Sequence, residues 1–366
     1  MRWNARLEGM RAYEPGKTIA EVKREYGLDR IVKLASNENP FGCPPAASRY
    51  LKEMDLETAL YPDGYSTALR SALAEKLGVS ARQLLFGSGS DEIIVILARA
   101  LLSQDDNTVA PWPSFPQYRH NARIEGAELR EIPLKDNRHD LDSMLRAIDE
   151  NTSIVWLCSP NNPTGGIIPD DELRAFISRV PEHVLVVVDN AYHEYASAVD
   201  YRDPVDLIDD FPNVIVLRTF SKAYGLAALR VGYAVGAEAV ISKLEPVRSP
   251  FNTTVAGQGA ALAALGGDEF IRECREKNER GKEQYVNFAR KHGLDCPRSE
   301  ANFVLMEIRG TADHVAAELL KRGFIVRSGD KLGTPGYIRI TVGTEEDNEA
   351  LLGALAEVLA HSVPGA

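Results

Sequence analysis

The sequence predicts an α/β fold in which a mostly parallel sheet is covered by helices, followed by a smaller α+β C-terminal domain. Three observations support this prediction. Short apolar runs alternate with amphipathic stretches through most of the 366 residues, residues 184–188 read VLVVV, and the pattern changes near Ser249. A chain of this length exceeds what one hydrophobic core usually supports, so a large domain with a smaller companion is expected.

The predicted strands of the large domain are short and bounded by polar or glycine-containing segments. They lie at 83–86, 107–110, 127–132, 153–158, 184–189, 213–218 and 231–236, with helices from about Asp91 to Leu102 and over 170–180. A strand that is apolar at every position, such as 184–188, is typical of a parallel sheet buried on both faces.

The pattern after Ser249 indicates a different arrangement. Residues 253–267 and 267–293 have the character of long helices, and strand-like runs at 302–308, 323–329 and 337–343 then alternate with helical stretches. A sheet with helices on one face suits this order. We therefore predict an N-terminal arm (1–29), a large domain (30–248) and a small C-terminal domain (249–366).

Composition excludes several classes of partner. With 44% hydrophobic and 26% charged residues the chain has the make-up of an ordinary globular protein. Its net charge of −11 argues against nucleic acid or an anionic membrane as a partner. The four cysteines, which are widely spaced, suggest neither disulfides nor a metal site. No apolar run is long enough for a membrane span and the N-terminus is charged, so we expect a cytoplasmic protein.

Polar groups of different kinds follow three successive strands. Asn162 lies in SPNNPTGG, Asp189 ends the run VLVVVD with Tyr192 close behind it, and Lys222 follows NVIVLR in TFSK. The carboxyl ends of parallel strands open onto one crevice, where ligands bind. An amide, a carboxylate, a phenol and an amine are therefore expected around one ligand.

Each of these groups has a simpler interpretation when taken alone. An aspartate after a strand is usually a cap or turn residue, and a lysine there is usually solvated. A candidate phosphate site weakens these interpretations. The segment GSGSDE, 87–92, joins a strand to a helix whose first amides could bind an anion, although a helix simply capped by Ser90 is an equal alternative on local evidence.

Thr219, Ser221 and Arg230 could complete the phosphate site with two hydroxyls and a guanidinium. A phosphate site, a carboxylate and an amine together suit pyridoxal phosphate. Its aldehyde forms a Schiff base with a lysine, here Lys222, and its ring nitrogen needs an acidic partner, here Asp189. Asn162 and Tyr192 would hydrogen-bond the ring hydroxyl.

The chain also resembles a known family over nearly its full length. The motifs AYEPGK, KLASNENPFG, YPDG, GSGSDE, SPNNPTG, DNAYHEY, TFSKAYGLAALRVGY, PFNTT, ANFV and YIRITVGT occur in the order found in fold type I, class II aminotransferases, and within that group the chain is similar to histidinol-phosphate aminotransferases. The resemblance implies the roles given above for Lys222, Asp189, Asn162 and Tyr192. It also places the Ser90 and Asp91 amides at the phosphate.

Further residues are assigned by the resemblance alone. Phe115 would stack on the cofactor ring, and Tyr61 would reach the cofactor phosphate of a neighbouring subunit, which implies a homodimer. Arg339 and Arg327 would hold the acidic group of the substrate. Tyr13 and Asn37 would close over the substrate.

The resemblance implies transamination of histidinol phosphate with 2-oxoglutarate, a small-molecule amino donor and a 2-oxo acid. An aromatic amino-acid aminotransferase on the same scaffold is the alternative. A related decarboxylase is less favoured, and a silent regulator would need a fused DNA-binding segment or a lost lysine. Three positions depart from the family pattern: Asn190 replaces an acidic residue, Cys43 interrupts PFGP and Ala228 replaces a glycine.

Overall fold

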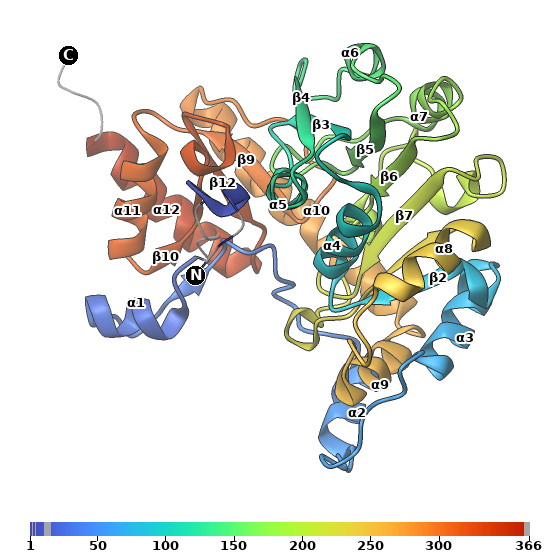
Figure 1. Ribbon diagram of the computed structural model, residues 1–366. Coiled ribbons are helices and arrows are strands. Elements are labelled where there is room, and N and C mark those ends of the chain that lie inside the picture. Colours follow the sequence, from blue (N-terminus) through green and yellow to red (C-terminus); the bar gives the residue numbers. More distant parts are fainter. Residues whose placement is uncertain (2, 4, 11–15, 362–366) are drawn as a thin grey trace.

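The computed structural model describes residues 1, 3, 5–10 and 16–361 and contains three sheets (Figure 1). The strands are β1 (Val32–Lys33), β2 (Leu84–Gly87), β3 (Asn107–Trp112), β4 (Glu128–Pro133), β5 (Thr152–Cys158), β6 (Leu185–Asp189), β7 (Val214–Thr219), β8 (Gly232–Gly236), β9 (Phe303–Glu307), β10 (Phe324–Ile325), β11 (Arg327–Ser328) and β12 (Tyr337–Thr341). The α-helices are α1 (Ile19–Tyr26), α2 (Pro45–Glu53), α3 (Thr67–Leu77), α4 (Ser90–Leu101), α5 (Gln117–Glu125), α6 (Leu141–Arg146), α7 (Asp170–Ile177), α8 (Glu238–Leu244), α9 (Val255–Ala264), α10 (Asp268–His292), α11 (Ala312–Lys321) and α12 (Glu345–His361).

The largest sheet has seven strands in the order β2-β8-β7-β6-β5-β3-β4. Its pairs from β4 through β7 are parallel, whereas β8 runs antiparallel to both β7 and β2. The predicted fold class is therefore confirmed. Asp189 at the end of β6 is in register with Cys158 of β5 and with Leu217 of β7, so the carboxyl ends of these strands lie side by side.

Both faces of this sheet are buried, which explains the continuous apolar runs. Val186 and Val188 of β6 point into one core, which α3, α6, α7 and α9 complete, while Leu185 and Val187 point into a second core formed with α4, α5 and α8. Successive side chains of a strand alternate between its two faces, so a strand between two helical layers must be apolar throughout.

The C-terminal part has its own core around a three-stranded antiparallel sheet, β11-β12-β9, with α10, α11 and α12 packed against it. It lies at one end of the molecule, coloured orange and red in Figure 1. Helix α9 instead packs against α2 and α3 on the large sheet. The domain limits 30–248 and 249–366 stay predictions.

The N-terminal segment touches both parts. Val22 of α1 packs beside Ile325 of β10, and Arg123 of α5 donates to the carbonyl of Glu8 at 3.1 Å. Among residues 1, 3, 5–10 and 16–361, no helix combines the length and apolar character that crossing a membrane requires.

Candidate active site

A cavity of about 300 Å³ lies where the large sheet meets the three-stranded sheet. Its lining includes the last residues of β5, β6 and β7, which are Cys158, Asp189 and Thr219, and one arginine each from β11 and β12, Arg327 and Arg339. The strand ends of the large sheet and the C-terminal sheet therefore both contribute to the wall of the cavity.

The residues singled out from the sequence line this cavity, apart from two tyrosines. The lining ones are Asn37, Ser90, Asp91, Phe115, Asn162, Asp189, Tyr192, Thr219, Ser221, Lys222, Arg230, Arg327 and Arg339. Tyr61 lies outside it, with 80% of its surface exposed, and stacks on Phe251 with ring centroids 4.6 Å apart. Tyr13 lies outside the described residues.

Lys222 follows β7 and is partly buried in the cavity wall. Its Nζ donates to the carbonyl oxygen of Ser36 at 3.2 Å and lies 5.7 Å from the centroid of the Tyr192 ring. Burial, reinforced by the charge of Arg339, lowers the pKa of the Lys222 ammonium to about 8. A lysine with this pKa has a much larger neutral fraction near neutral pH than an ordinary lysine, and the neutral amine is the form that acts as a nucleophile or base.

Asp189 is almost fully buried at the end of β6. Its Oδ2 accepts a 2.6 Å hydrogen bond from the hydroxyl of Tyr118, a residue of α5 that stacks on Trp156. Burial raises the pKa of Asp189 to about 6, although the Tyr118 hydrogen bond opposes the rise. A buried carboxylate of this kind is stabilised by a cationic partner, and a protonated ring nitrogen is one.

The contact of Tyr118 with Asp189 was not predicted from the sequence. The segment 115–118 reads FPQY, which places Tyr118 three residues after Phe115 at the start of a helix, and the two rings meet edge to face. Helical spacing would have put both rings on one face. The hydrogen bond to Asp189 has no local signal, because it joins residues from different elements.

The turn between β2 and α4, which we call the glycine turn (residues 87–90), faces Arg230. The N-cap of α4 is Gly89, with φ at 78° and no side-chain cap, so the alternative of a helix capped by Ser90 is wrong. A Cβ at Gly232 would lie 2.4 Å from the Ser90 nitrogen, and one at Gly89 would lie 2.5 Å from Nη2 of Arg230. The contact with the Ser90 backbone requires glycine at position 232, whereas at position 89 the positive φ favours glycine.

The groups around the glycine turn can bind an anion. Nη1 of Arg230 donates to Oγ of Ser221 at 3.1 Å, and Thr219 lies beside them at the end of β7. The first turn of an α-helix carries amide groups without intrahelical partners and the positive end of the helix dipole. Amides, hydroxyls and a guanidinium are the donors that a phosphate group accepts from.

Arg339, Asn162, Asn37 and Tyr192 form a second polar group in the cavity. Nη1 of Arg339 donates to Oδ1 of Asn162 at 2.6 Å, and Nδ2 of Asn37 donates to the Tyr192 hydroxyl at 2.9 Å. The hydroxyl of Thr341 donates to Oδ1 of Asn37 at 3.0 Å. Thr341 was also missed, although it is two residues beyond Arg339 on one strand, so the two share a face.

Arg327 and Arg339, two of the three arginines that line the cavity, are neighbours across a strand pair. Arg327 of β11 is the register partner of Arg339 of β12. Directly opposed side chains in an antiparallel pair lie on the same face of the sheet, here toward the cavity. Two adjacent guanidiniums are suited to a dianionic group, because like charges held together need more than one negative charge to balance them.

The cavity therefore fits pyridoxal phosphate. The glycine turn with Arg230 and Ser221 would hold the phosphate, Asp189 would face the ring nitrogen, and Lys222 would meet the aldehyde. Asn190, one of the three departures from the family pattern, does not line the cavity. Its Nδ2 donates instead to the carbonyl of Ser159 at 2.6 Å and to the Tyr201 hydroxyl at 2.7 Å. The described residues contain no group of acidic, histidine and cysteine side chains placed to hold a metal ion.

Known proteins with similar sequences are aminotransferases. The model of the family described as aminotransferase class I and II matches residues 29–355. The chain is 55% identical over 359 residues to the histidinol-phosphate aminotransferase of Lysinibacillus sphaericus, covering 98% of each chain. It is also 55% identical over 360 residues to that of Bacillus subtilis strain 168, covering 98% of this chain and 100% of the relative.

Solved structures share the fold across the whole chain. A histidinol-phosphate aminotransferase from Sinorhizobium meliloti, solved in complex with pyridoxal 5'-phosphate, superposes with a TM-score of 0.90 at 28% identity, covering 99% of this chain and 98% of that one. A double mutant of the Thermus thermophilus aspartate aminotransferase superposes with a TM-score of 0.84 at 25% identity, covering 99% and 100%.

Proposed function

We propose that this chain, which belongs to the aminotransferase class I and II family, transfers the amino group of histidinol phosphate to 2-oxoglutarate in histidine biosynthesis. It is a pyridoxal phosphate-dependent aminotransferase. The structural observation that best supports this substrate is the pair of arginines, Arg327 and Arg339, which are in register and both line the cavity. The aromatic amino-acid alternative is not favoured by the relatives.

When bound, pyridoxal phosphate supplies an aldehyde that condenses with amines and a ring that withdraws electrons from the substrate carbon. We assign the proton transfers to Nζ of Lys222, whose pKa near 8 allows it to accept a proton and return it close to neutral pH. The Asp189 carboxylate would keep the ring nitrogen protonated. The Tyr192 hydroxyl, which accepts from Asn37, would direct its own proton into the cavity.

Arg339 and Arg327 would bind the acidic group of each substrate in turn. The phosphate ester of histidinol phosphate is close to a dianion, and two guanidiniums can neutralise it. A carboxylate of 2-oxoglutarate would use the same position, since one bidentate arginine satisfies a monoanion. Both half-reactions then use one anion site at the wall formed by β11 and β12.

We further propose a homodimer in which Tyr61 completes the site of the neighbouring subunit. Tyr61 lies away from its own cavity, and Leu60, Tyr65 and Phe251 near it in the chain or in space are also exposed. Large apolar groups gathered on a surface mark interaction sites. The cytoplasmic location stays a prediction.

A donor panel tests the proposed function. The kcat/KM of the purified enzyme is measured for histidinol phosphate, phenylalanine, tyrosine and histidine, with 2-oxoglutarate as acceptor. We expect histidinol phosphate to be preferred by at least about tenfold, because the other donors lack the phosphate. A consistent preference for phenylalanine or tyrosine would assign the enzyme to the aromatic alternative.

A further inference from the structure

The glycine turn is held from behind by two side chains that do not line the cavity, Glu92 and Asn252. Oε2 of Glu92 accepts a 2.5 Å hydrogen bond from the backbone nitrogen of Ser88 and a 2.8 Å hydrogen bond from Nδ2 of Asn252. The same Nδ2 donates to the carbonyl of Phe86 at 3.0 Å. The residue before the turn and a residue within it are thus tied to one carboxylate–amide pair.

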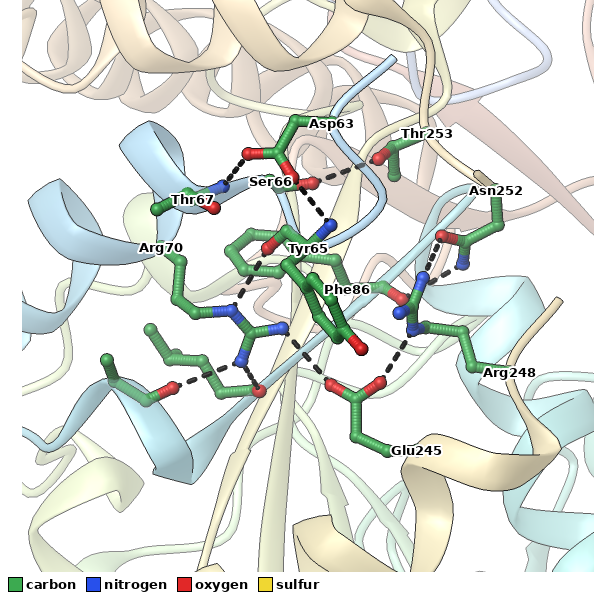
Figure 2. Close-up of polar contacts among 12 residues, drawn as sticks. Asp63, Tyr65, Ser66, Thr67, Arg70, Phe86, Glu245, Arg248, Asn252 and Thr253 are labelled. Atoms are coloured by element: carbon green, nitrogen blue, oxygen red, sulfur yellow. Dashed lines mark hydrogen bonds and ion pairs between the residues drawn. The ribbon is translucent and has the colours of Figure 1, made fainter. Parts of the chain in front are cut away.

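The orientation of Asn252 is itself fixed by an ion pair. Nη1 of Arg248 donates to Oδ1 of Asn252 at 3.0 Å, so the amide nitrogen of Asn252 must face Glu92 and Phe86. Nε of Arg248 donates to Oε2 of Glu245 at 2.9 Å (Figure 2). The Arg248 side chain is only 8% exposed. We call the four residues Glu92, Asn252, Arg248 and Glu245 the relay.

The far end of the relay reaches the segment that carries Tyr61. The second carboxylate oxygen of Glu245 accepts from Nη2 of Arg70 at 3.1 Å, and Nε of Arg70 donates to the carbonyl of Tyr65 at 3.0 Å (Figure 2). The side chains of Glu245 and Arg70 are 25% and 14% exposed. Partly buried ion pairs are screened less by salt than exposed ones and hold a defined geometry.

We propose that Glu92 and Asn252 are positioning residues for the cofactor phosphate, and that Arg248 and Glu245 fix the amide of Asn252 for this task. The inference rests on the proposed function for the identity of the ligand. Backbone amides bind a phosphate tightly only when their directions are set beforehand, and residues behind a binding group commonly set them. The relay thereby makes phosphate affinity depend on side chains that never touch the phosphate.

The test compares two ligands that differ only in the phosphate. The full-length protein, freed of cofactor, is titrated with pyridoxal phosphate and with pyridoxal, and binding is followed by absorbance. For Glu92→Ala and Asn252→Ala we expect the Kd of pyridoxal phosphate to rise at least about tenfold, while the Kd of pyridoxal changes less than about twofold. Glu245→Gln should shift the ratio of the two constants in the same direction by about threefold, because its amide retains an acceptor for one arginine only.

Conservative and remote variants separate positioning from general destabilisation. Glu92→Gln should leave the ratio of the two constants nearly unchanged, because a single amide oxygen can accept from both Ser88 and Asn252. Glu269→Ala removes an exposed carboxylate of α10 that pairs with Arg272, and should leave both constants unchanged. If Asn252→Ala does not fold, the Glu92 variants decide alone.

Failure of the positioning role and failure of the proposed function would give different results. Parallel losses for both ligands, or no change in the ratio for any relay variant, would overturn the positioning role while leaving the cofactor assignment intact. Failure of the wild-type protein to bind either ligand covalently would instead overturn the proposed function.

Discussion

Burial changes the pKa values of Lys222 and Asp189, two ionisable groups of opposite sign in the cavity. It lowers the pKa of Lys222 to about 8 and raises that of Asp189 to about 6, because each charged form loses hydration. The two values leave Asp189 mostly ionised and Lys222 partly neutral near neutral pH. A carboxylate for a ring cation and an amine that can act as a base are then present together.

The uptake of pyridoxal phosphate by the cofactor-free protein should follow the ionisation of Lys222. Only the neutral amine is nucleophilic, so the initial rate should rise with pH, by about tenfold between about pH 7 and pH 9, and then level off. Stopped-flow absorbance of the bound cofactor measures it. Lys222→Ala should show no covalent uptake. If the rate instead kept rising up to about pH 10.5, the ordinary pKa of lysine, the pKa of Lys222 would not be lowered by burial.

Arg327→Ala should distinguish the two donor classes. A phosphate dianion loses one of its two guanidinium partners, whereas a carboxylate keeps Arg339. We therefore expect kcat/KM for histidinol phosphate to fall at least about tenfold more than that for phenylalanine, which corresponds to about 1.4 kcal/mol of selective transition-state stabilisation. Arg272→Ala, on the exposed face of α10, is the control. Equal losses for both donors would remove the phosphate-binding role from Arg327.

At the scale of elements, β7 carries a buried charge at Arg218, next in the chain to Thr219 of the cavity lining. Arg218 is 3% exposed, and its Nη2 donates to Oδ1 of Asp203 at 2.6 Å. Asp203 also lies 3.5 Å from Nε2 of His193. The ion pair connects the strand that leads to Lys222 with the segment after β6, so it ties together the two strands that deliver the lysine and the carboxylate.

Asp203→Asn should destabilise the fold rather than the chemistry. The buried Arg218 guanidinium would lose its counter-charge, and because Asp203 is about one-third exposed we expect a loss of about 2 kcal/mol in the free energy of unfolding. Urea unfolding of the holoenzyme measures the loss. Asp210→Asn, which removes an exposed partner of Arg174, should cost no more than about 0.5 kcal/mol. Similar small losses for both variants would show that the Arg218 pair contributes little.

For the whole molecule, the cavity is lined by residues of two sheets, and the proposed dimer would bring a second chain to it. Tyr61 is exposed and stacks on Phe251, outside its own cavity. In a symmetric dimer each subunit presents the same surface to its partner, so a residue that reaches across does so twice.

Mixing two defective variants tests this arrangement. Lys222→Ala and Tyr61→Ala homodimers should each have little activity, but a heterodimer would contain one site with both native residues. After subunit exchange of equal amounts, about one quarter of the wild-type activity should return. Steady-state assays before and after exchange measure the recovery, and light scattering checks the two-chain mass. Absence of recovery with demonstrated exchange would place Tyr61 outside the shared site.

Patterns in the sequence predicted the class of fold and grouped the polar residues at the strand ends, whereas Phe115, Arg327 and Arg339 were assigned only through resemblance to a family. Alternation and continuous apolar runs define the strands, and the polar residues that follow them, Asn162, Asp189 and Lys222, meet because carboxyl ends of neighbouring parallel strands share one edge. The glycine turn was visible for a similar local reason, since Gly87 and Gly89 separate a strand from a helix.

The hydrogen bonds that support these residues became visible in the folded structure alone. Tyr118 binds Asp189 across 71 positions, Asn252 binds Glu92 across 160, and Thr341 binds Asn37 across 304. Local periodicity specifies which face of an element a side chain occupies, but not which distant element packs against that face. A change of a few tenths of an ångström in the distance between donor and acceptor is enough to weaken a hydrogen bond. The packing of whole layers sets these distances.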